Sequence, residues 1–189
     1  VKAAFDALLL QQPDSPLLLE AYATLGDAKK RESYDRERNN ISGKTFSGYR
    51  FGDLIAEGGF GKTYKGVQIL RNLPVCLKHC FRLSPQMKQV LIDEMVAVWD
   101  RTHFAIPVMR NMIELPDTSL VLVMSYIPGP TLAQAVEKLG RLDPIHVAWI
   151  TERILNALKY LHAYGIIHGA IKPQNIILQP DEHMATLID

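Results

Sequence analysis

The chain has 189 residues, of which 48% are hydrophobic and 22% charged, and its formal net charge at pH 7 is +1. This composition is ordinary for a globular protein with a buried core, and the near-zero charge gives no electrostatic reason to expect a nucleic-acid or membrane partner. The length allows one domain with an appendage or one large domain cut short.

Localisation is indicated by what the sequence lacks. No apolar run approaches the roughly 20 residues of a membrane-spanning helix, and the first residues lack a signal-peptide pattern. The two cysteines, Cys76 and Cys80, are four residues apart in an expected strand, and so lie on one face of it. We interpret them as small buried residues in a reducing compartment, and therefore predict a cytoplasmic protein.

Residues 1–38 are expected to be helical, because apolar residues recur at helical spacing on both sides of a break at residues 12–16. The stretch from Glu20 to Asp35 resembles the last helices of a J-domain. That co-chaperone module acts through a His-Pro-Asp tripeptide, whose counterpart here is Gln12-Pro13-Asp14, and only five residues separate Asp14 from Glu20. Both departures favour a degenerate helical hairpin used for packing or docking. Residues 39–48 are polar and are predicted to be a linker.

A glycine-rich hairpin is expected next. A strand pattern that includes Tyr49 and Phe51 leads into Ala56-Glu57-Gly58-Gly59-Phe60-Gly61, and a second strand is expected over residues 62–67. Such glycines allow a phosphate to approach the backbone closely. The segment resembles the Gly-rich loop of protein kinases, with Ala56 at the first Gly and Thr63 at the Val.

Two further segments are similar to that family. Val75-Cys76-Leu77-Lys78 resembles the kinase Val-Ala-Ile-Lys strand, in which a buried lysine needs a partner. A helix is expected over residues 85–101, with Glu94 on the same face as Leu91 and Val98. The resemblance implies that Glu94 pairs with Lys78 and orients it toward the α- and β-phosphates of ATP.

The apolar strand expected over residues 119–124 ends at a turn signal, Pro128-Gly129. This switch resembles the kinase hinge, where backbone groups of residues 125–127 would bind the adenine edge and Met124 would line the back of the pocket. A long helix is expected over residues 144–164, which leads the chain into the last motif.

Residues 167–178 resemble the kinase catalytic loop, His-Arg-Asp-x-Lys-Pro-x-Asn, with Gly169 at the Arg and Ala170 at the Asp. The resemblance implies that Lys172 neutralises the transferring phosphate, as in serine/threonine kinases, that Asn175 and Asp189 hold Mg²⁺, and that Ile177 forms the adenine floor opposite Cys76. Ala170 cannot accept a proton, and losing a positioned general base typically costs about 10² to 10⁴ in rate.

These motifs predict an α+β, protein-kinase-like fold: an antiparallel N-lobe over residues 49–124, a hinge over 125–130 and the beginning of a helical C-lobe over 131–189. Because the family's large lobe continues past the position of Asp189, the chain is expected to be a fragment. The residues predicted to bind the nucleotide are Ile55, Ala56, Gly58, Gly59, Gly61, Cys76, Lys78, Glu94, Met124, Ser125, Tyr126, Ile127 and Ile177.

The predicted function is that of a pseudokinase, which binds ATP and Mg²⁺ but transfers phosphate poorly or not at all, and which acts on a protein partner as a switch or scaffold. Two alternatives remain open. One is an active serine/threonine kinase in which another group, for example a carboxylate beyond Asp189, replaces the lost base. The other is a co-chaperone or docking protein that works through residues 1–38.

Overall fold

A computed structural model describes residues 2–9, 15–31, 41–81 and 83–189. The chain divides into two compact units, residues 1–42 and 43–189. The tripeptide Gln12-Pro13-Asp14, the end of the J-domain-like pattern at Ser33–Asp35, and Asn39 and Asn40 of the expected linker lie outside the described residues. Among the described residues, no helix combines the length and apolarity that crossing a bilayer requires.

The described part of the first unit includes the helices α1 (Lys2–Leu9) and α2 (Pro16–Leu25), and residues 28–31 are also helical. α1 and α2 contact each other through Phe5 and Tyr22, whose rings stack with centroids 4.0 Å apart. α2 buries no residue, and Leu17 is 78% exposed. The described part of this unit therefore has little apolar core of its own.

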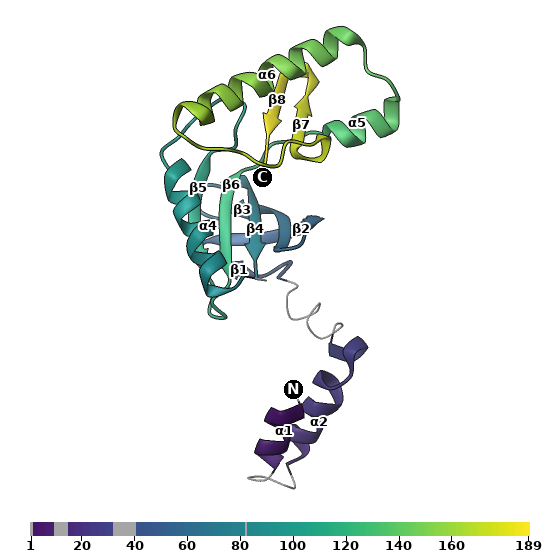
Figure 1. The fold of residues 1–189 in the computed structure, drawn as a ribbon, viewed down its shortest axis with the longest axis vertical. Coiled ribbons are helices and arrows are strands. Elements are labelled where there is room, and N and C mark those ends of the chain that lie inside the picture. Colours follow the sequence, from purple (N-terminus) through teal and green to yellow (C-terminus); the bar gives the residue numbers. More distant parts are fainter. Residues whose placement is uncertain (1, 10–14, 32–40, 82) are drawn as a thin grey trace. The chain divides into compact units, whose positions relative to one another are not determined.

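The second unit begins with a six-stranded antiparallel sheet in the order β1-β2-β3-β4-β6-β5 (Figure 1). Its strands are β1 (Thr45–Phe46), β2 (Tyr49–Glu57), β3 (Gly61–Gln68), β4 (Leu73–Cys80), β5 (Met109–Glu114) and β6 (Leu120–Ser125). The sequence did not lead us to expect β1 or β5. Helix α4 (Pro85–Val98) follows β4, and the Ser84 side chain caps it by accepting a hydrogen bond from the Met87 amide at 3.2 Å.

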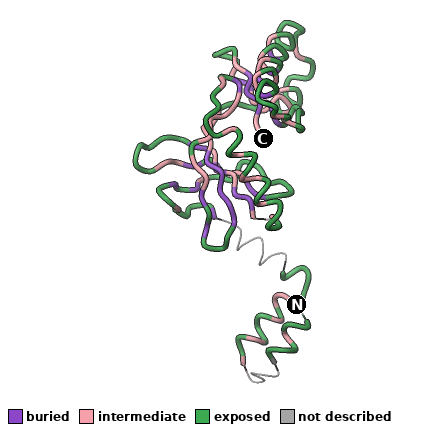
Figure 2. Tube along the Cα trace, turned by 60° about the vertical axis from the view of Figure 1, so that its left-hand side comes forward, coloured by how far each residue is buried: buried purple, intermediate pink, exposed green. Residues whose placement is uncertain are grey.

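Strand alternation gives the sheet two different faces. Along β4, Val75, Leu77 and His79 are at most 1% exposed, whereas Cys76 and Lys78 between them are only half-buried. Phe51 and Tyr64 extend the buried face across β2 and β3. The tube in Figure 2 shows long buried stretches in the strands of the sheet, and further buried residues in the helical part of the chain. The sheet therefore has a core face, and an opposite face that we call the Lys78 face.

The rest of the unit is a helical layer on a small hairpin. It comprises α5 (Leu132–Leu139), α6 (Pro144–Ala163), the hairpin β7 (Ile176–Gln179) and β8 (Met184–Leu187), and two 3₁₀ turns, Pro173–Asn175 and Pro180–Glu182. α6 lies along the hairpin (Figure 1), and Ile150 and Ile154 of α6 share one buried cluster with strand residues. The hairpin members of that cluster are Ile176, Leu178, Ala185 and Leu187. The unit is α+β, as predicted.

Gly129 fixes the segment between β6 and α5 against the hairpin. Its φ is +133°, and a Cβ atom at this position would lie 2.1 Å from the Leu178 carbonyl oxygen. The Leu178 amide also donates a hydrogen bond to the Pro130 carbonyl oxygen at 2.9 Å. Only glycine combines this backbone conformation with this close approach.

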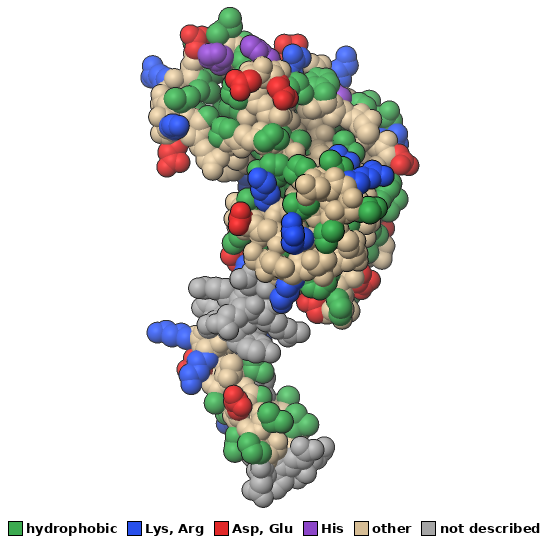
Figure 3. Space-filling view, turned by 180° about the vertical axis from the view of Figure 1, so that it is seen from behind, with side chains coloured by type: hydrophobic (Ala, Val, Ile, Leu, Met, Phe, Trp, Pro, Cys, Tyr) green, Lys and Arg blue, Asp and Glu red, His purple; other side chains and the backbone are tan. Residues whose placement is uncertain are grey.

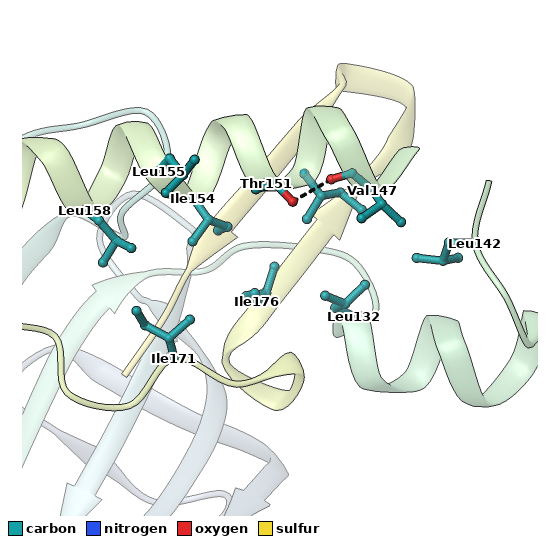
Figure 4. Close-up of a pocket in the computed structure, with 10 residues that line it drawn as sticks. Leu132, Leu142, Val147, Thr151, Ile154, Leu155, Leu158, Ile171 and Ile176 are labelled. Carbon is teal, nitrogen blue, oxygen red and sulfur yellow. Dashed lines mark hydrogen bonds between the residues drawn. The ribbon is translucent and has the colours of Figure 1, made fainter. Parts of the chain in front are cut away.

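An open apolar pocket of about 300 Å³ lies between α5, α6 and the loop before β7 (Figure 4). Its lining includes Leu132, Ile154, Ile171 and Ile176. None of the residues predicted to bind the nucleotide lines it. It therefore belongs to the packing of the helical layer rather than to the predicted site.

Side chains of both charge signs are interspersed over the face of the molecule seen in Figure 3, in keeping with the small net charge.

Candidate nucleotide site

Strand register places several predicted residues side by side on the Lys78 face. Ala56 pairs with Thr63, Thr63 with Lys78, and Lys78 with Leu122, so these four residues form a row across four strands. In the neighbouring row, Cys76 pairs with Met124. Direct partners in antiparallel strands point to the same side of a sheet. The Lys78 face therefore brings together Ala56, Cys76, Lys78 and Met124.

The end of the β7–β8 hairpin meets this face through an ion pair between Lys78 and Asp189. Ile176 pairs with Leu187, and the Ile188 amide donates to the Asn175 carbonyl oxygen at 2.9 Å, so Asn175 and Asp189 come to the same end of the hairpin. The side chains of Lys78 and Asp189 remain 28% and 46% exposed. The two charges are thus paired but reachable by a ligand.

The loop before β7 is ordered around Asn175, which is 6% exposed. Its Nδ2 donates to the Ala170 carbonyl oxygen at 3.0 Å, and its backbone amide donates to the Lys172 carbonyl oxygen at 2.9 Å. The donor end of the Asn175 amide is therefore occupied by the loop, which leaves the acceptor oxygen for another group. Lys172 itself is exposed.

His168 ties the loop to the segment that carries Asp189. Its Nδ1 accepts a hydrogen bond from the Ala170 amide at 3.3 Å, and its ring also bonds to the backbone of Ile188. Burial lowers the pKa of His168, against opposing effects from Ile188 and the Asp189 charge. Gly169, between His168 and Ala170, has a φ of +72°, where a residue with a side chain would be strained by roughly 1 kcal/mol or more.

The predicted Gly-rich turn joins β2 and β3. The Gly58 amide donates to the Gly61 carbonyl oxygen at 2.9 Å, and Cβ atoms at Gly58 or Gly59 would meet nothing within 4 Å. At Gly61 a Cβ would lie 1.9 Å from the His79 carbonyl oxygen. Gly61 therefore permits close packing of β3 on β4, while Gly58 and Gly59 leave open space. Ile55 and Ala56, just before the turn, are exposed.

The predicted hinge, residues 125–130, begins at the end of β6. The Ser125 amide donates to the Val108 carbonyl oxygen, and Ser125 Oγ accepts from the Val108 amide, both at 2.9 Å. Within the described residues, no backbone hydrogen bond engages Tyr126 or Ile127. Their amide and carbonyl groups are therefore available to a ligand. Half-buried Ile177 forms an isolated bridge with Thr131, directly after this segment.

Glu94 is not brought to the site. It is exposed, and the ion pairs formed by the described residues do not include Lys78 with Glu94, since Lys78 pairs with Asp189. The reason lies in α4, which buries none of its residues and is attached at its first turns, where Lys88 Nζ contacts Glu114 Oε1 at 2.7 Å and the Thr118 carbonyl oxygen at 2.8 Å. The expected Lys78–Glu94 contact is absent from this structure, and the role of Glu94 stays a prediction.

The sequence did not reveal a buried hydrogen-bonded network of three side chains that starts at His79, the residue after Lys78, on the core face of the sheet. His79 is 1% exposed, its Nε2 lies 2.8 Å from Ser119 Oγ, and Ser119 Oγ donates to Asp117 Oδ1 at 2.6 Å. Because the serine proton goes to Asp117, Nε2 must be the protonated ring nitrogen, and Nδ1 has no partner among the described residues. Desolvation lowers the pKa of His79 to about 4, helped by Lys62 and opposed by Asp117. A histidine inside an apolar strand was the only sequence signal.

This histidine predicts acid-sensitive stability. Unfolded His79 binds a proton near pH 6.5, whereas folded His79 does so only near pH 4, so the free energy of unfolding should fall as pH drops through this window. The full effect is roughly 3 kcal/mol. Urea unfolding between pH 7.5 and 4.5 measures it, with His79→Gln as the control that keeps an N–H donor. Parallel curves for wild type and variant would exclude His79 as the titrating group.

The comparisons with known proteins all point to the same family. A family model described as a protein kinase domain matches residues 49–189. Similar proteins include CBL-interacting serine/threonine-protein kinase 16 of Arabidopsis thaliana (26% identity, 75% of this chain, 31% of the relative). Serine/threonine-protein kinase 36 of Mus musculus is 34% identical over 69% of this chain and 10% of its own length. The chain thus spans less than a third of either relative.

A solved structure shares the fold. Rad53 residues 1–466 in complex with AMP-PNP superpose on 86% of this chain, and on 42% of that chain, with a TM-score of 0.69 and 22% identity. The kinase-like α+β fold predicted from the motifs is therefore confirmed for the second unit.

Proposed function

The chain belongs to the protein kinase family through residues 49–189, and from this premise we propose that it binds ATP with Mg²⁺ while transferring phosphate poorly or not at all. The observation that carries the proposal is the arrangement around Asp189. Lys78 and Asn175, which suit phosphate and metal, lie beside it, whereas Ala170 stands in the same loop without a proton acceptor. Such a module would act on a protein partner as a nucleotide-dependent switch or scaffold.

The base of the nucleotide would bind at the hinge. The unengaged backbone groups of Tyr126 and Ile127 offer donors and acceptors for an adenine edge, and Cys76 and Met124 supply apolar surface on the Lys78 face. Ile177, next to the hinge in the β7 bridge, would form the opposite wall. The similarity to Rad53, which was solved with AMP-PNP, supports nucleotide binding by the present chain.

The residues present fit a magnesium ion. Asn175 has its amide oxygen unengaged by the loop, and Asp189 supplies a carboxylate that is 46% exposed. These are hard oxygen donors of the kind that Mg²⁺ binds, commonly one or two from the protein with water and phosphate completing the shell. The described residues hold no group of three or more His, Cys, Asp or Glu side chains suited to a metal. When bound, the ion would neutralise phosphate charge.

Lys78 would have to exchange partners when a nucleotide enters. Its ammonium now neutralises Asp189, so a phosphate would compete for Lys78 and leave Asp189 free for the metal. Glu94 could take part only if α4 moved toward the sheet. Because α4 has no buried residue, such a movement would break little apolar packing.

The transfer step would lack its proton acceptor. The backbone of Ala170 is held on both sides, with its amide bonded to His168 and its carbonyl to Asn175, but its methyl side chain cannot accept the proton of an attacking hydroxyl. His168 is a poor replacement, because hydrogen bonds engage its ring. Exposed Lys172 could still offset phosphate charge.

An active serine/threonine kinase is the second candidate, favoured by relatives that carry that name. It requires a proton acceptor other than residue 170. Phosphotransfer that disappears on Lys78→Ala would establish it. The co-chaperone alternative falls on residues that include Gln12, Pro13 and Asp14, outside the described part of the chain.

The melting temperature of the full-length protein tests the proposed nucleotide binding. ATP with Mg²⁺ at a hundred times its dissociation constant should stabilise the fold by about 2.7 kcal/mol, which raises the melting temperature by several degrees. EDTA should remove most of the shift, and Lys78→Met should abolish it. Lys159→Met, an exposed lysine on α6, is the matched control that should keep it. No shift in the wild type would contradict nucleotide binding.

A further inference from the structure

Two turns meet at one end of the antiparallel sheet, the turn between β1 and β2 and the turn between β3 and β4. A hydrogen bond from the Ile69 amide to the Gly48 carbonyl oxygen, at 2.9 Å, joins them. Tyr49, directly after the first turn, also pairs with Gln68, directly before the second. The two turns therefore form one continuous surface. We call this surface, residues 43–50 and 67–74, the sheet tip.

The sheet tip exposes apolar side chains. Leu70 is 89% exposed, the highest value for a large hydrophobic residue in the described part of the chain, and Ile69 and Leu73 are 48% and 42% exposed. The Asn72 amide donates to the Ile69 carbonyl oxygen at 3.3 Å, which makes Leu70 and Arg71 the central residues of a tight turn. The φ of Asn72 is +51°, a conformation that asparagine tolerates. Leu70 therefore projects into solvent from a turn that a hydrogen bond closes.

The charges of the sheet tip are all positive. Lys44, Arg50 and Arg71 are exposed there, and the segment contains no aspartate or glutamate. The ion pairs formed among the described residues include none of these three cations. The sheet tip therefore carries three uncompensated positive charges around its exposed aliphatic side chains.

The acidic residues of the sheet lie away from the tip. Register pairs Glu57 of β2 with Lys62 of β3, and Glu114 of β5 with Leu120 of β6. Lys62 and Leu120 lie against the last two residues of β4, whereas the sheet tip includes its first two. Asp53 lies midway along β2. The net charge of +1 for the whole chain conceals this separation along the strands.

We propose that the sheet tip binds the surface of an anionic lipid bilayer, with Leu70 entering the interface and the three cations facing the headgroups. Apolar side chains beside cations are the combination that holds peripheral proteins on anionic membranes. The centre of a protein–protein interface is depleted of charged residues, and a protein partner would need a pocket shaped for this turn. A fluid bilayer needs no such pocket. A convex turn that mixes leucine with cations therefore favours lipid.

Sedimentation of the full-length protein with lipid vesicles tests this proposal. Vesicles of phosphatidylcholine mixed with phosphatidylserine should bind the protein, and vesicles of phosphatidylcholine alone should bind it much more weakly. Leu70→Ser should weaken binding to the anionic vesicles about tenfold or more, because it removes the most exposed apolar side chain. Arg71→Gln should weaken binding about fivefold, the usual effect of one cation near an anionic surface.

Matched controls come from the end of α5 and the loop after it. Leu139 is 67% exposed and Arg141 is also exposed, so Leu139→Ser and Arg141→Gln repeat the two chemical changes away from the sheet tip. Both should bind the anionic vesicles as the wild type does. An unchanged melting temperature checks that each variant is folded, as the exposure of the substituted residues leads us to expect.

Three results would overturn the proposal. The first is a wild type that does not bind anionic vesicles, or that binds both kinds of vesicle equally. The second is a Leu70→Ser variant that binds as tightly as the wild type. The third is a wild type that self-associates without lipid while Leu70→Ser stays monomeric in sedimentation velocity, which would make the sheet tip an interface between proteins.

Discussion

Replacing Ala170 with aspartate is expected to raise the rate of phosphoryl transfer by about two to four orders of magnitude, the usual contribution of a positioned general base. The backbone at this position is already anchored. The Ala170 amide bonds to His168 Nδ1 at 3.3 Å, and its carbonyl oxygen accepts from Asn175 Nδ2 at 3.0 Å. A carboxylate introduced here would therefore start from a fixed backbone in an exposed loop, with Lys172 two residues away in sequence.

The measurement is transfer of the labelled γ-phosphate from ATP to a protein substrate or to the protein itself, made on the full-length protein. Ala170→Asn is the matched control, because it has nearly the shape of aspartate but cannot serve as a base at neutral pH. Equal rates for the Asp and Asn variants would contradict the idea that a missing proton acceptor limits transfer. A wild-type rate that already equals the Asp variant would favour the active-kinase alternative.

Gly129→Ala is expected to lower the free energy of unfolding by about 3 kcal/mol or more, because it combines backbone strain with a steric clash. The new methyl group would lie 2.1 Å from the Leu178 carbonyl oxygen, at a residue whose φ is +133°. To relieve this overlap, the segment after β6 must move away from β7, which endangers the bond between the Leu178 amide and the Pro130 carbonyl oxygen.

Chemical unfolding of wild type and variant measures this loss. Gly140→Ala separates its two causes, because Gly140 also has a positive φ, +74°, but a Cβ there would meet nothing within 4 Å. The control should lose only about 1 to 3 kcal/mol, the cost of a backbone conformation that residues with a side chain rarely adopt (φ +74°, ψ −124°). Equal losses at the two glycines would show that the close approach to Leu178 has no energetic importance.

The features predicted most accurately from the sequence are the helices, strands and turns that depend on local residue patterns and on the order of the motifs. The strand that carries Lys78, the glycine turn and the long helix before the loop all follow from short-range periodicity and turn residues, and β4, the Gly58–Gly61 turn and α6 lie where these predict. β5 was missed because Met109–Glu114 mixes apolar and polar residues without clean alternation, and its burial pattern is equally irregular.

Contacts between segments far apart in the sequence could not be predicted from residue patterns. Helical spacing places Glu94 on a face of α4, but how far α4 lies from the sheet depends on packing that no spacing encodes. The partner of His79 is Ser119, 40 residues away. Gly129 is readable as a turn signal, but its approach to Leu178 requires the hairpin to be in place. The ion pair of Lys78 with Asp189 spans 111 residues.

The fate of bound ATP tests the central claim most directly. The full-length protein is mixed with a substoichiometric amount of γ-labelled ATP and Mg²⁺, so that nearly all nucleotide is bound, and the reaction is quenched at intervals from milliseconds to hours. Binding without transfer predicts that the label co-elutes with the protein before quenching and is recovered as intact ATP afterwards. Transfer of the label at about 1 to 100 per second, as in active kinases, or failure of ATP to bind at all, would contradict the account.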